Sequence, residues 1–178
     1  MPRSSSPGAE RADSTDRAGG VGGVRARQGG LDASSVEHLM GYLLALAEVP
    51  TSAAFRRHVG EPYGLKPVEF TLLMLLKSNR RASATQIRRA LRMPAPHVTT
   101  LVDRLVERGL VQRARDPDDG RAVRISPTAA GAALADKLQG VAAHMEDHVQ
   151  AALTAAERTQ LRRLLVKLAR SGDAESGD

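Results

Sequence analysis

The stretch Arg113–Ser126, RARDPDDGRAVRIS, decides the fold. It contains two short alternating arms around a tip with one proline, one glycine and three aspartates. Alternation of this kind is typical of strands, and Pro and Gly favour a chain reversal. We therefore predict a two-stranded hairpin that carries four arginines: Arg113, Arg115, Arg121 and Arg124.

Two short helices are expected before this hairpin. Ser83 and Gln86 form a capping box, which predicts a helix over 84–91, ATQIRRAL. After the turn RMPAP, the segment 97–109 predicts a longer helix that ends at Gly109. Its buried stripe is expected to be Val98, Leu101, Val102 and Leu105. A helix-turn-helix followed at once by a basic hairpin is a winged helix, and an exposed surface hairpin with incidental ion pairs is the alternative.

Further helices flank this unit. Ser34 with Glu37 predicts the start of a first helix, which Pro50 should kink or end. Pro67 suits the first turn of a central, mostly apolar helix over 68–79. Thr128 is expected to cap a long helix, and Thr154 with Glu157 to begin a last one. The long helix carries Leu134, Leu138, Val141, Met145 and Val149, and the last carries Leu161, Leu164, Leu165 and Leu168.

Composition and charge limit the function classes. The 178 residues include no cysteine, which excludes thiol chemistry and Cys-ligated zinc. No apolar window is long enough to span a bilayer and the N-terminus lacks a signal-like run, so we expect a cytoplasmic protein with no membrane partner. Residues 77–126 hold twelve Lys or Arg against five Asp or Glu, whereas the net charge of the whole chain is +6. Such a local excess favours a nucleic-acid partner, although a soluble arginine-rich surface has the same composition.

The run 101–131, LVDRLVERGLVQRARDPDDGRAVRISPTAAG, resembles the signature of the MarR (multiple antibiotic resistance regulator) family. The matching parts are LVERGLVQR, the Asp119-Gly120-Arg121 wing motif and PTAAG at 127–131. The likeness extends from about residue 31 to residue 169. It departs from the family pattern at Pro94, His97, Thr100 and Pro127, so no base preference is carried over.

The resemblance implies an obligate homodimer in which terminal helices of both subunits interlock. The leucine stripes of those helices, which have no partner elsewhere in so small a chain, agree with this. The expected fold class is mainly α with a small β-hairpin wing, made of a winged helix-turn-helix lobe and a helical dimerisation region. The expected segments are a disordered tail (1–30), a dimerisation helix (31–64), the DNA-binding lobe (65–126), the C-terminal dimerisation helices (127–170) and a frayed end (171–178).

Helix position predicts which residues face double-stranded DNA. We expect Arg121 near the hairpin tip to enter the minor groove and the other hairpin arginines to meet phosphates. Asp116 and Asp119 are expected to hold arginines in place. His97, Thr99 and Thr100 could read bases, with a phosphate contact as the alternative for Thr99 and an idle surface position for His97. The expected recognition face is Ala95, Pro96, His97, Thr99, Thr100 and Arg104.

The resemblance also implies an effector. Members of the family are commonly repressors released by small aromatic acids, and all four aromatic residues fall between 42 and 70, where the pocket is expected. His38, Tyr42 and Phe70 are the candidate pocket residues, although Phe70 also suits a core and His38 a structural role. His144 and His148 have a spacing that could hold a metal, but two ligands are too few, so no metal or cofactor is expected.

No catalytic residues are predicted, because the sequence has neither a phosphate-binding glycine loop nor a recognisable nucleophile arrangement. The expected function is a sequence-specific, homodimeric transcriptional regulator that represses a palindromic operator and is released by a small aromatic or phenolic ligand. Two other readings stay open: a non-specific architectural DNA-binding protein, and a winged-helix adaptor between proteins.

Overall fold

The protein is described by a computed structural model that covers residues 30–115 and 123–171. The chain divides into two compact units, and the boundary, between Ala45 and Leu46, falls inside the first helix. The predicted tail, Gly30 excepted, and the end of the chain after Ser171 lie outside the described residues. The domain boundaries expected from the sequence remain a prediction.

The first helix begins later than the sequence predicts. Residues 34–38 form turns, and α1 runs over Met40–Phe55. The amide of Ser34 donates a hydrogen bond of 2.9 Å to Oδ1 of Asp32, so Ser34 belongs to a turn and not to a helix cap. This hydrogen bond from the backbone lowers the pKa of the Asp32 carboxyl. The predicted start at Ser34 was therefore wrong, and His38 lies in the turn before α1.

Pro50 does not end α1. The helix continues through it, and the hydroxyl of the next residue, Thr51, donates to the carbonyls of Ala47 (3.2 Å) and Glu48 (2.9 Å). The helix passes directly into a π-helical turn, Arg56–Gly60, and then into α2, Glu61–Tyr63. Helix α2 ends at Gly64, which has a φ of +58°, the left-handed conformation that glycine adopts most easily.

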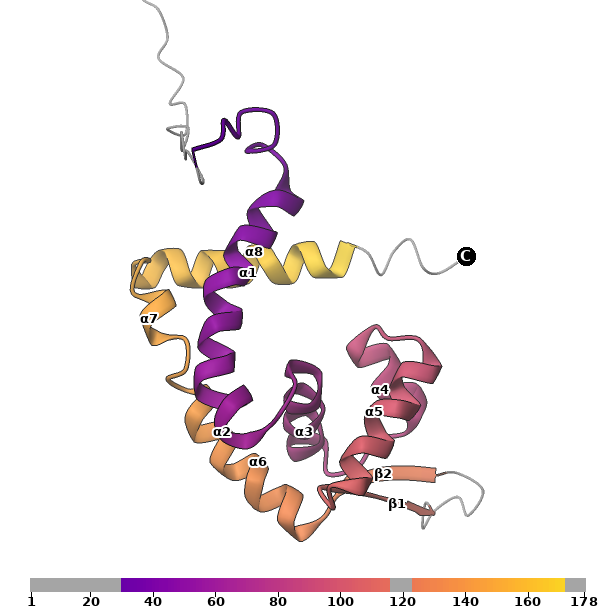
Figure 1. The fold of residues 1–178 in the computed structure, drawn as a ribbon. Helices are drawn as coiled ribbons and strands as arrows, with labels where there is room; N and C mark the ends of the chain where they lie inside the picture. Colours follow the sequence, from indigo (N-terminus) through magenta and orange to yellow (C-terminus); the bar gives the residue numbers. More distant parts are fainter. Residues whose placement is uncertain (1–29, 116–122, 172–178) are drawn as a thin grey trace, which may run out of the picture. The chain divides into compact units, whose positions relative to one another are not determined.

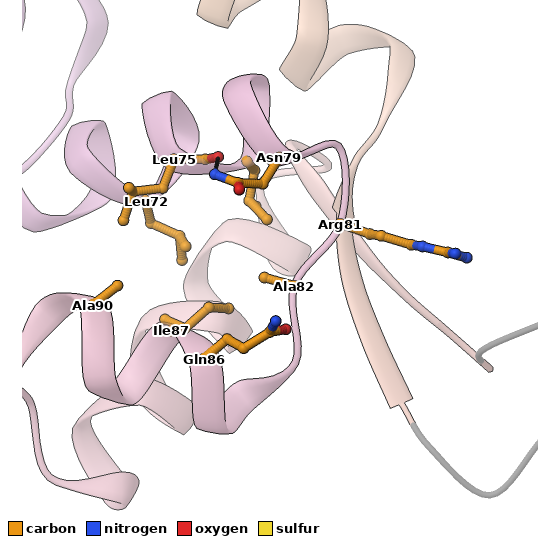
Figure 2. Close-up of a pocket in the computed structure, with 9 residues that line it drawn as sticks. Leu72, Leu75, Asn79, Arg81, Ala82, Gln86, Ile87 and Ala90 are labelled. Carbon is orange, nitrogen blue, oxygen red and sulfur yellow. Dashed lines mark hydrogen bonds between the residues drawn. The ribbon is translucent and has the colours of Figure 1, made fainter. Parts of the chain in front are cut away.

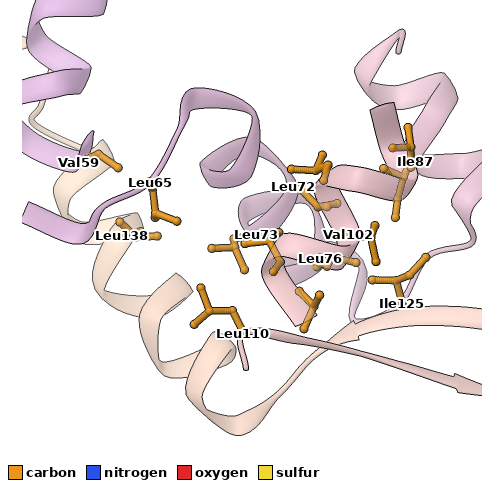
Figure 3. Packing of buried hydrophobic residues seen from close by; sticks show 14 residues of the cluster. Val59, Leu65, Leu72, Leu73, Leu76, Ile87, Val102, Leu110, Ile125 and Leu138 are labelled. Atoms are coloured by element: carbon orange, nitrogen blue, oxygen red, sulfur yellow. The ribbon is translucent and has the colours of Figure 1, made fainter. Parts of the chain in front are cut away.

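The unit that starts at Leu46 is built around α3, Pro67–Asn79 (Figure 1). Around it lie α4, Ala84–Leu91, and α5, Ala95–Glu107, followed by the strands β1, Val111–Arg115, and β2, Val123–Pro127. Leu72, Leu73 and Leu76 of α3 are fully buried at the centre of one apolar cluster (Figure 3). The predicted central helix is confirmed. The predicted stripe of α5 is buried in the same cluster: Val98, Leu101, Val102 and Leu105.

Local capping signals position the helix pair. The amide of Gln86 donates to Oγ of Ser83 at 3.2 Å, and the amide of Ser83 donates to Oε1 of Gln86 at 2.8 Å. The predicted capping box is therefore confirmed, and it fixes the start of α4. Helix α5 begins with Ala95 after the N-cap Pro94 and ends before Gly109, which has a φ of +66°.

The hairpin is antiparallel, as predicted. Arg113 pairs with Ile125, and Arg115 pairs with Val123. At its base, Ala82 and Ile125 exchange two backbone hydrogen bonds, of 2.9 and 2.8 Å. The segment between α3 and α4 therefore holds the second strand in place. The tip, which contains Asp116, Asp119 and Arg121, lies outside the described residues.

The long C-terminal helix predicted from Thr128 is interrupted. Helix α6 covers Ala129–Ala142, and a separate turn of helix, α7, covers Asp147–Gln150. Between them, the amides of His144 and Asp147 bond three residues back, which interrupts the helical pattern, whereas the Met145 amide still bonds four residues back to Val141. The prediction of one continuous helix up to Val149 was therefore wrong, whereas the Thr128 cap is confirmed by its 3.0 Å bond from the Gly131 amide.

The last helix, α8, covers Ala155–Ser171, and its predicted capping box is confirmed by the Thr154 and Glu157 hydrogen bonds. Bonds from the amide and hydroxyl of Thr154 lower the pKa of the Glu157 carboxyl. None of the residues of α8, all of which the structure describes, is buried. Four leucines of this helix, each 40–47% exposed, form one face: Leu161, Leu164, Leu165 and Leu168.

Candidate nucleic-acid interface

Helix α5 presents a polar face to solvent. Its apolar stripe anchors it in the core, so the residues between those positions point outward. All six residues predicted to face DNA are exposed: Ala95, Pro96, His97, Thr99, Thr100 and Arg104. Helical periodicity was sufficient to predict that these residues are exposed, because the buried residues of α5 recur at intervals of three and four positions.

The two threonines of this face have their hydroxyl groups engaged. Oγ1 of Thr99 donates to the Ala95 carbonyl at 3.2 Å, and Oγ1 of Thr100 donates to the Pro96 carbonyl at 3.1 Å. Each hydroxyl proton is therefore used inside the helix. The methyl groups and the hydroxyl lone pairs remain for contacts with a partner.

The arginines of the hairpin divide between its two faces. Strand alternation places Arg113 and Arg115 on one face and Arg124 on the other. The Arg113 guanidinium donates to Oδ1 of Asp103 on α5 at 2.6 Å. Arg115 is exposed. The tip aspartates were predicted to hold the arginines, and the contact with Asp103 was not predicted, because no periodic pattern connects α5 to β1.

Arg124 is directed toward α4. Its Nη1 donates to Oε1 of Gln86 at 3.2 Å, and this same oxygen accepts the Ser83 amide. A single side-chain amide therefore caps α4 and holds an arginine of β2. Gln86 was predicted as a capping residue, but its contact with the wing was missed.

The turn between α5 and β1 is packed tightly against the start of α6. The Thr128 hydroxyl donates to the Gly109 carbonyl at 2.6 Å, and the Thr128 amide donates to the Leu110 carbonyl at 3.1 Å. A Cβ atom on Gly131 would lie 1.8 Å from the Leu110 carbonyl oxygen, so only glycine fits there. The Thr-x-x-Gly motif is thus the contact that sets α6 against the helix-to-wing turn.

A small cavity lies between α3 and α4, with a volume of about 120 Å³ (Figure 2). Leu72, Leu75 and Ile87 form its apolar wall, and Arg81 at its edge points away from it. None of the three predicted effector residues lines this cavity. Phe70 instead packs edge-on against Phe55, with ring centroids 5.7 Å apart. His38 and Tyr42 belong to the unit that ends at Ala45.

The described residues contain neither a metal-binding cluster nor a membrane-spanning helix. Within residues 30–115 and 123–171, no group of three or more acidic or histidine side chains could hold a metal ion. His144 makes a 3.2 Å contact with Asp147, and both side chains are exposed. In the part of the chain that the structure describes, no helix is long and apolar enough to cross a membrane.

Comparisons with known proteins agree with this geometry. Residues 63–122 match the model of the MarR family. The HTH-type transcriptional repressor NicR of Pseudomonas putida is 30% identical over 133 residues, which cover 75% of this chain and 84% of NicR. The chain belongs to the MarR family. As a MarR-family member, it is a DNA-binding transcriptional regulator with a winged helix-turn-helix.

Solved MarR-type structures extend the match. The transcriptional repressor CouR, bound to a 23-mer DNA duplex, is 29% identical, has a TM-score of 0.72 and is matched over 79% of this chain and 99% of CouR. BpsR of Bordetella bronchiseptica, whose DNA binding is regulated by 6-hydroxynicotinic acid, is 25% identical with a TM-score of 0.69, over 75% of this chain and 95% of BpsR. CouR is named as a transcriptional repressor, and BpsR as a protein whose DNA binding is regulated.

Proposed function

We propose that this MarR-family protein is a homodimeric repressor of a palindromic operator and is released by a small aromatic or phenolic ligand. It has no proposed catalytic role. The observation that carries the proposal is the exposed face of α5, which stands next to a hairpin rich in arginine. The relatives named as repressors support the sign of regulation.

The proposed base contacts come from the first turns of α5. This end of a recognition helix reaches base edges in the major groove. Because the hydroxyl protons of Thr99 and Thr100 are used inside the helix, their methyl groups are the proposed readers of thymine methyls. His97 is proposed as a hydrogen-bonding reader, and Arg104, one turn beyond Thr100, as a phosphate contact. Ala95 and Pro96 fill the remaining space against the groove.

The wing is proposed to hold the DNA backbone. Arg115 and Arg124 are proposed phosphate contacts, and Arg121 is proposed to enter the minor groove with Asp116 and Asp119 holding the tip. Arg113 belongs to the same set, but Asp103 neutralises part of its charge. We therefore assign Arg113 a smaller share of the affinity than Arg115.

The proposed dimer would cover the exposed leucine faces. Residues Met40–Phe55 of α1 include no buried side chain, and the same holds for α8. Leaving such faces in water costs the free energy that their burial would release. A second copy of the chain is the proposed cover, with segments 31–64 and 127–170 as the dimerisation parts. A two-fold dimer requires a palindromic site with half-sites about one DNA turn apart.

The proposed effector is an aromatic acid or phenol, with His38, Tyr42 and Phe70 as its proposed contacts. The MarR-type protein BpsR responds to 6-hydroxynicotinic acid, which supports this chemical class. An imidazole, a phenol and an apolar ring suit a ligand that has one aromatic ring and one acidic group.

The test starts from a random-sequence DNA library. The purified full chain is used to select duplexes, and binding to the selected duplex and to its scrambled version is measured across a salt series. We expect a preference of at least about 10³-fold, with strong salt dependence. Equal binding to both duplexes would favour an architectural protein, and no binding at low salt would favour the adaptor. Release by 6-hydroxynicotinic or salicylic acid is measured on the selected duplex.

A further inference from the structure

Helix α3 contains a buried carboxylate that the proposed DNA contacts do not use. Glu69 is only 4% exposed, although it stands in the first turn of α3. Its Oε2 accepts the amide of Lys66 at 2.9 Å. A carboxylate at this position caps the helix and interacts favourably with the positive end of the helix dipole. One amide does not satisfy a buried carboxylate, which can accept several hydrogen bonds.

The remaining partner of Glu69 comes from the far end of α5. Arg108 follows the last residue of the recognition helix directly, and its Nη1 lies 3.5 Å from Oε2 of Glu69. The same Nη1 donates to the Gly64 carbonyl at 2.9 Å, and Nη2 donates to the Tyr63 carbonyl at 3.0 Å. One guanidinium therefore joins α5 to the end of α2 and to the start of α3.

Backbone geometry prepares this contact. Gly64 has a φ of +58°, and the chain turns there between α2 and α3, which presents two successive carbonyls, those of Tyr63 and Gly64, to one guanidinium. The planar fork of arginine can donate to both at once, whereas a lysine ammonium cannot match this geometry. The residues next to Arg108 are held as well, because Gly109 and Leu110 bond to Thr128.

We propose that Arg108 and Glu69 form a clamp that sets the orientation of the recognition helix, so that the clamp determines operator discrimination without touching DNA. This inference rests on the proposed function. Arg108 is then a positioning residue and not a phosphate contact. Its guanidinium already donates to two carbonyls and forms an ion pair with Glu69, whose negative charge would oppose a phosphate.

The clamp and a phosphate contact differ in two measurable ways. Loss of a phosphate contact weakens binding to all DNA alike and lowers the slope of log K against log salt by about one. Loss of a positioning contact misplaces the base-reading side chains, so it weakens binding to the operator selectively and leaves the slope unchanged. Loss of a purely structural contact changes the thermal stability. It changes neither the preference for the operator nor the salt slope, provided that binding is measured well below the melting temperature.

The experiment uses the full chain and the duplex that the wild type selects from random DNA, with its scrambled version as the second probe. The variants are Arg108→Gln, Arg108→Lys, Glu69→Gln and the double variant Arg108→Gln/Glu69→Gln. We expect each single variant to lose about tenfold in affinity for the selected duplex, comparable with one mismatched base pair, and to keep the wild-type affinity for scrambled DNA. The losses should not add in the double variant, since both residues serve one contact.

Arg115→Gln is the matched control, because it removes one exposed arginine that is a proposed phosphate contact. It should weaken binding to both duplexes and lower the salt slope. The proposal is overturned if Arg108→Gln behaves like this control, or if all four variants bind both duplexes like the wild type. Should Arg108→Gln fail to fold, two milder variants decide the question. Arg108→Lys keeps the positive charge, and Glu69→Gln keeps the shape of the side chain. If the wild type selects no sequence at all, the proposed function fails, and not the clamp.

Discussion

The guanidinium of Arg113 on β1 donates to the carboxylate of Asp103 on α5 at 2.6 Å, so the wing and the recognition helix share one charged contact. Both side chains are partly exposed, and such a pair contributes at most about 1 kcal/mol to stability. We expect the pair to matter for DNA binding as well, because the Asp103 carboxylate offsets the positive potential that Arg113 would present to a phosphate.

We expect Arg113→Gln and Arg115→Gln to differ in the salt dependence of DNA binding. Arg115→Gln should lower the slope of log K against log salt by about one, because a phosphate contact is lost. Arg113→Gln should change the slope clearly less, since Asp103 already neutralises that side chain. Fluorescence anisotropy over a salt series measures both, and equal slopes for the two variants would contradict this order.

The threonines of α5 are expected to read DNA through their methyl groups. Thr99→Val keeps the methyl and removes a hydroxyl that is bonded to Ala95, so the affinity for the selected operator should hold within about twofold. Thr99→Ser removes the methyl and should cost about fourfold, the value of one buried methyl group. The pair Thr100→Val and Thr100→Ser repeats the comparison. Val variants that lose as much as Ser variants would show that the hydroxyl, and not the methyl, is read.

Gly131 and Gly140 provide a matched pair within α6. Gly131→Ala should destabilise the protein by about 3 kcal/mol, because its Cβ atom would overlap the Leu110 carbonyl oxygen. Gly140→Ala has nothing within 4 Å of the new atom and should stabilise α6 by about 0.5–1 kcal/mol. Chemical denaturation at fixed protein concentration measures both changes. A neutral Gly131→Ala would mean that the α6 contact with Leu110 is loose.

The leucine face of α8 is expected to hold the dimer together. Leu164→Glu places a charge in the proposed interface twice, once in each subunit, and should weaken dimerisation by at least about 100-fold. Arg163→Glu introduces the same side chain on the opposite, basic face of the helix and should leave the dimer intact. Sedimentation equilibrium gives both dissociation constants, and a dimer that survives Leu164→Glu would place the interface elsewhere.

Glu157 should make the start of α8 sensitive to acid. The Thr154 hydrogen bonds depress the pKa of Glu157. Its stabilising effect is therefore complete above the ordinary glutamate pKa of 4.5 and is lost as the pH falls through the lowered pKa. The difference in Tm between wild type and Glu157→Gln should accordingly shrink under acidic conditions. An NMR titration of Glu157 with an ordinary or raised pKa would contradict this expectation.

Predictions from local sequence signals were correct where neighbouring residues alone determine the backbone structure. Ser83 with Gln86, Thr154 with Glu157, and the stripe of α5 were all predicted correctly, because each depends on residues within a few positions of one another. The helix start predicted from Ser34 and Glu37 was wrong, although these residues have the same spacing as the two capping boxes. Here the side chain of Asp32 accepts a hydrogen bond from the Ser34 amide, which favours a turn. The prediction of one continuous helix after Thr128 was wrong for another reason. The apolar residues keep a helical spacing through residues 143–146, but the backbone there is not helical.

The contacts that orient the candidate interface could not be predicted from periodicity. Arg108 and Glu69 are far apart in the sequence, and each resembles an ordinary surface charge of a helix end. Arg113 and Asp103 are closer, but they lie on a strand and a helix whose relative placement depends on the packed core. The exposed face of α5 was predictable, whereas the groups that hold this face in place were not.

The two backbone bonds between Ala82 and Ile125 have a consequence for how such regulators diversify. They fix the base of the wing through main-chain atoms, which every sequence supplies, and they lie outside the segment between Arg115 and Val123. We therefore expect these two bonds to form whatever the length or charge of the segment between those two residues. The base of the wing is in this sense a frame of main-chain atoms, on which side chains can change while the pairing with Ala82 is kept.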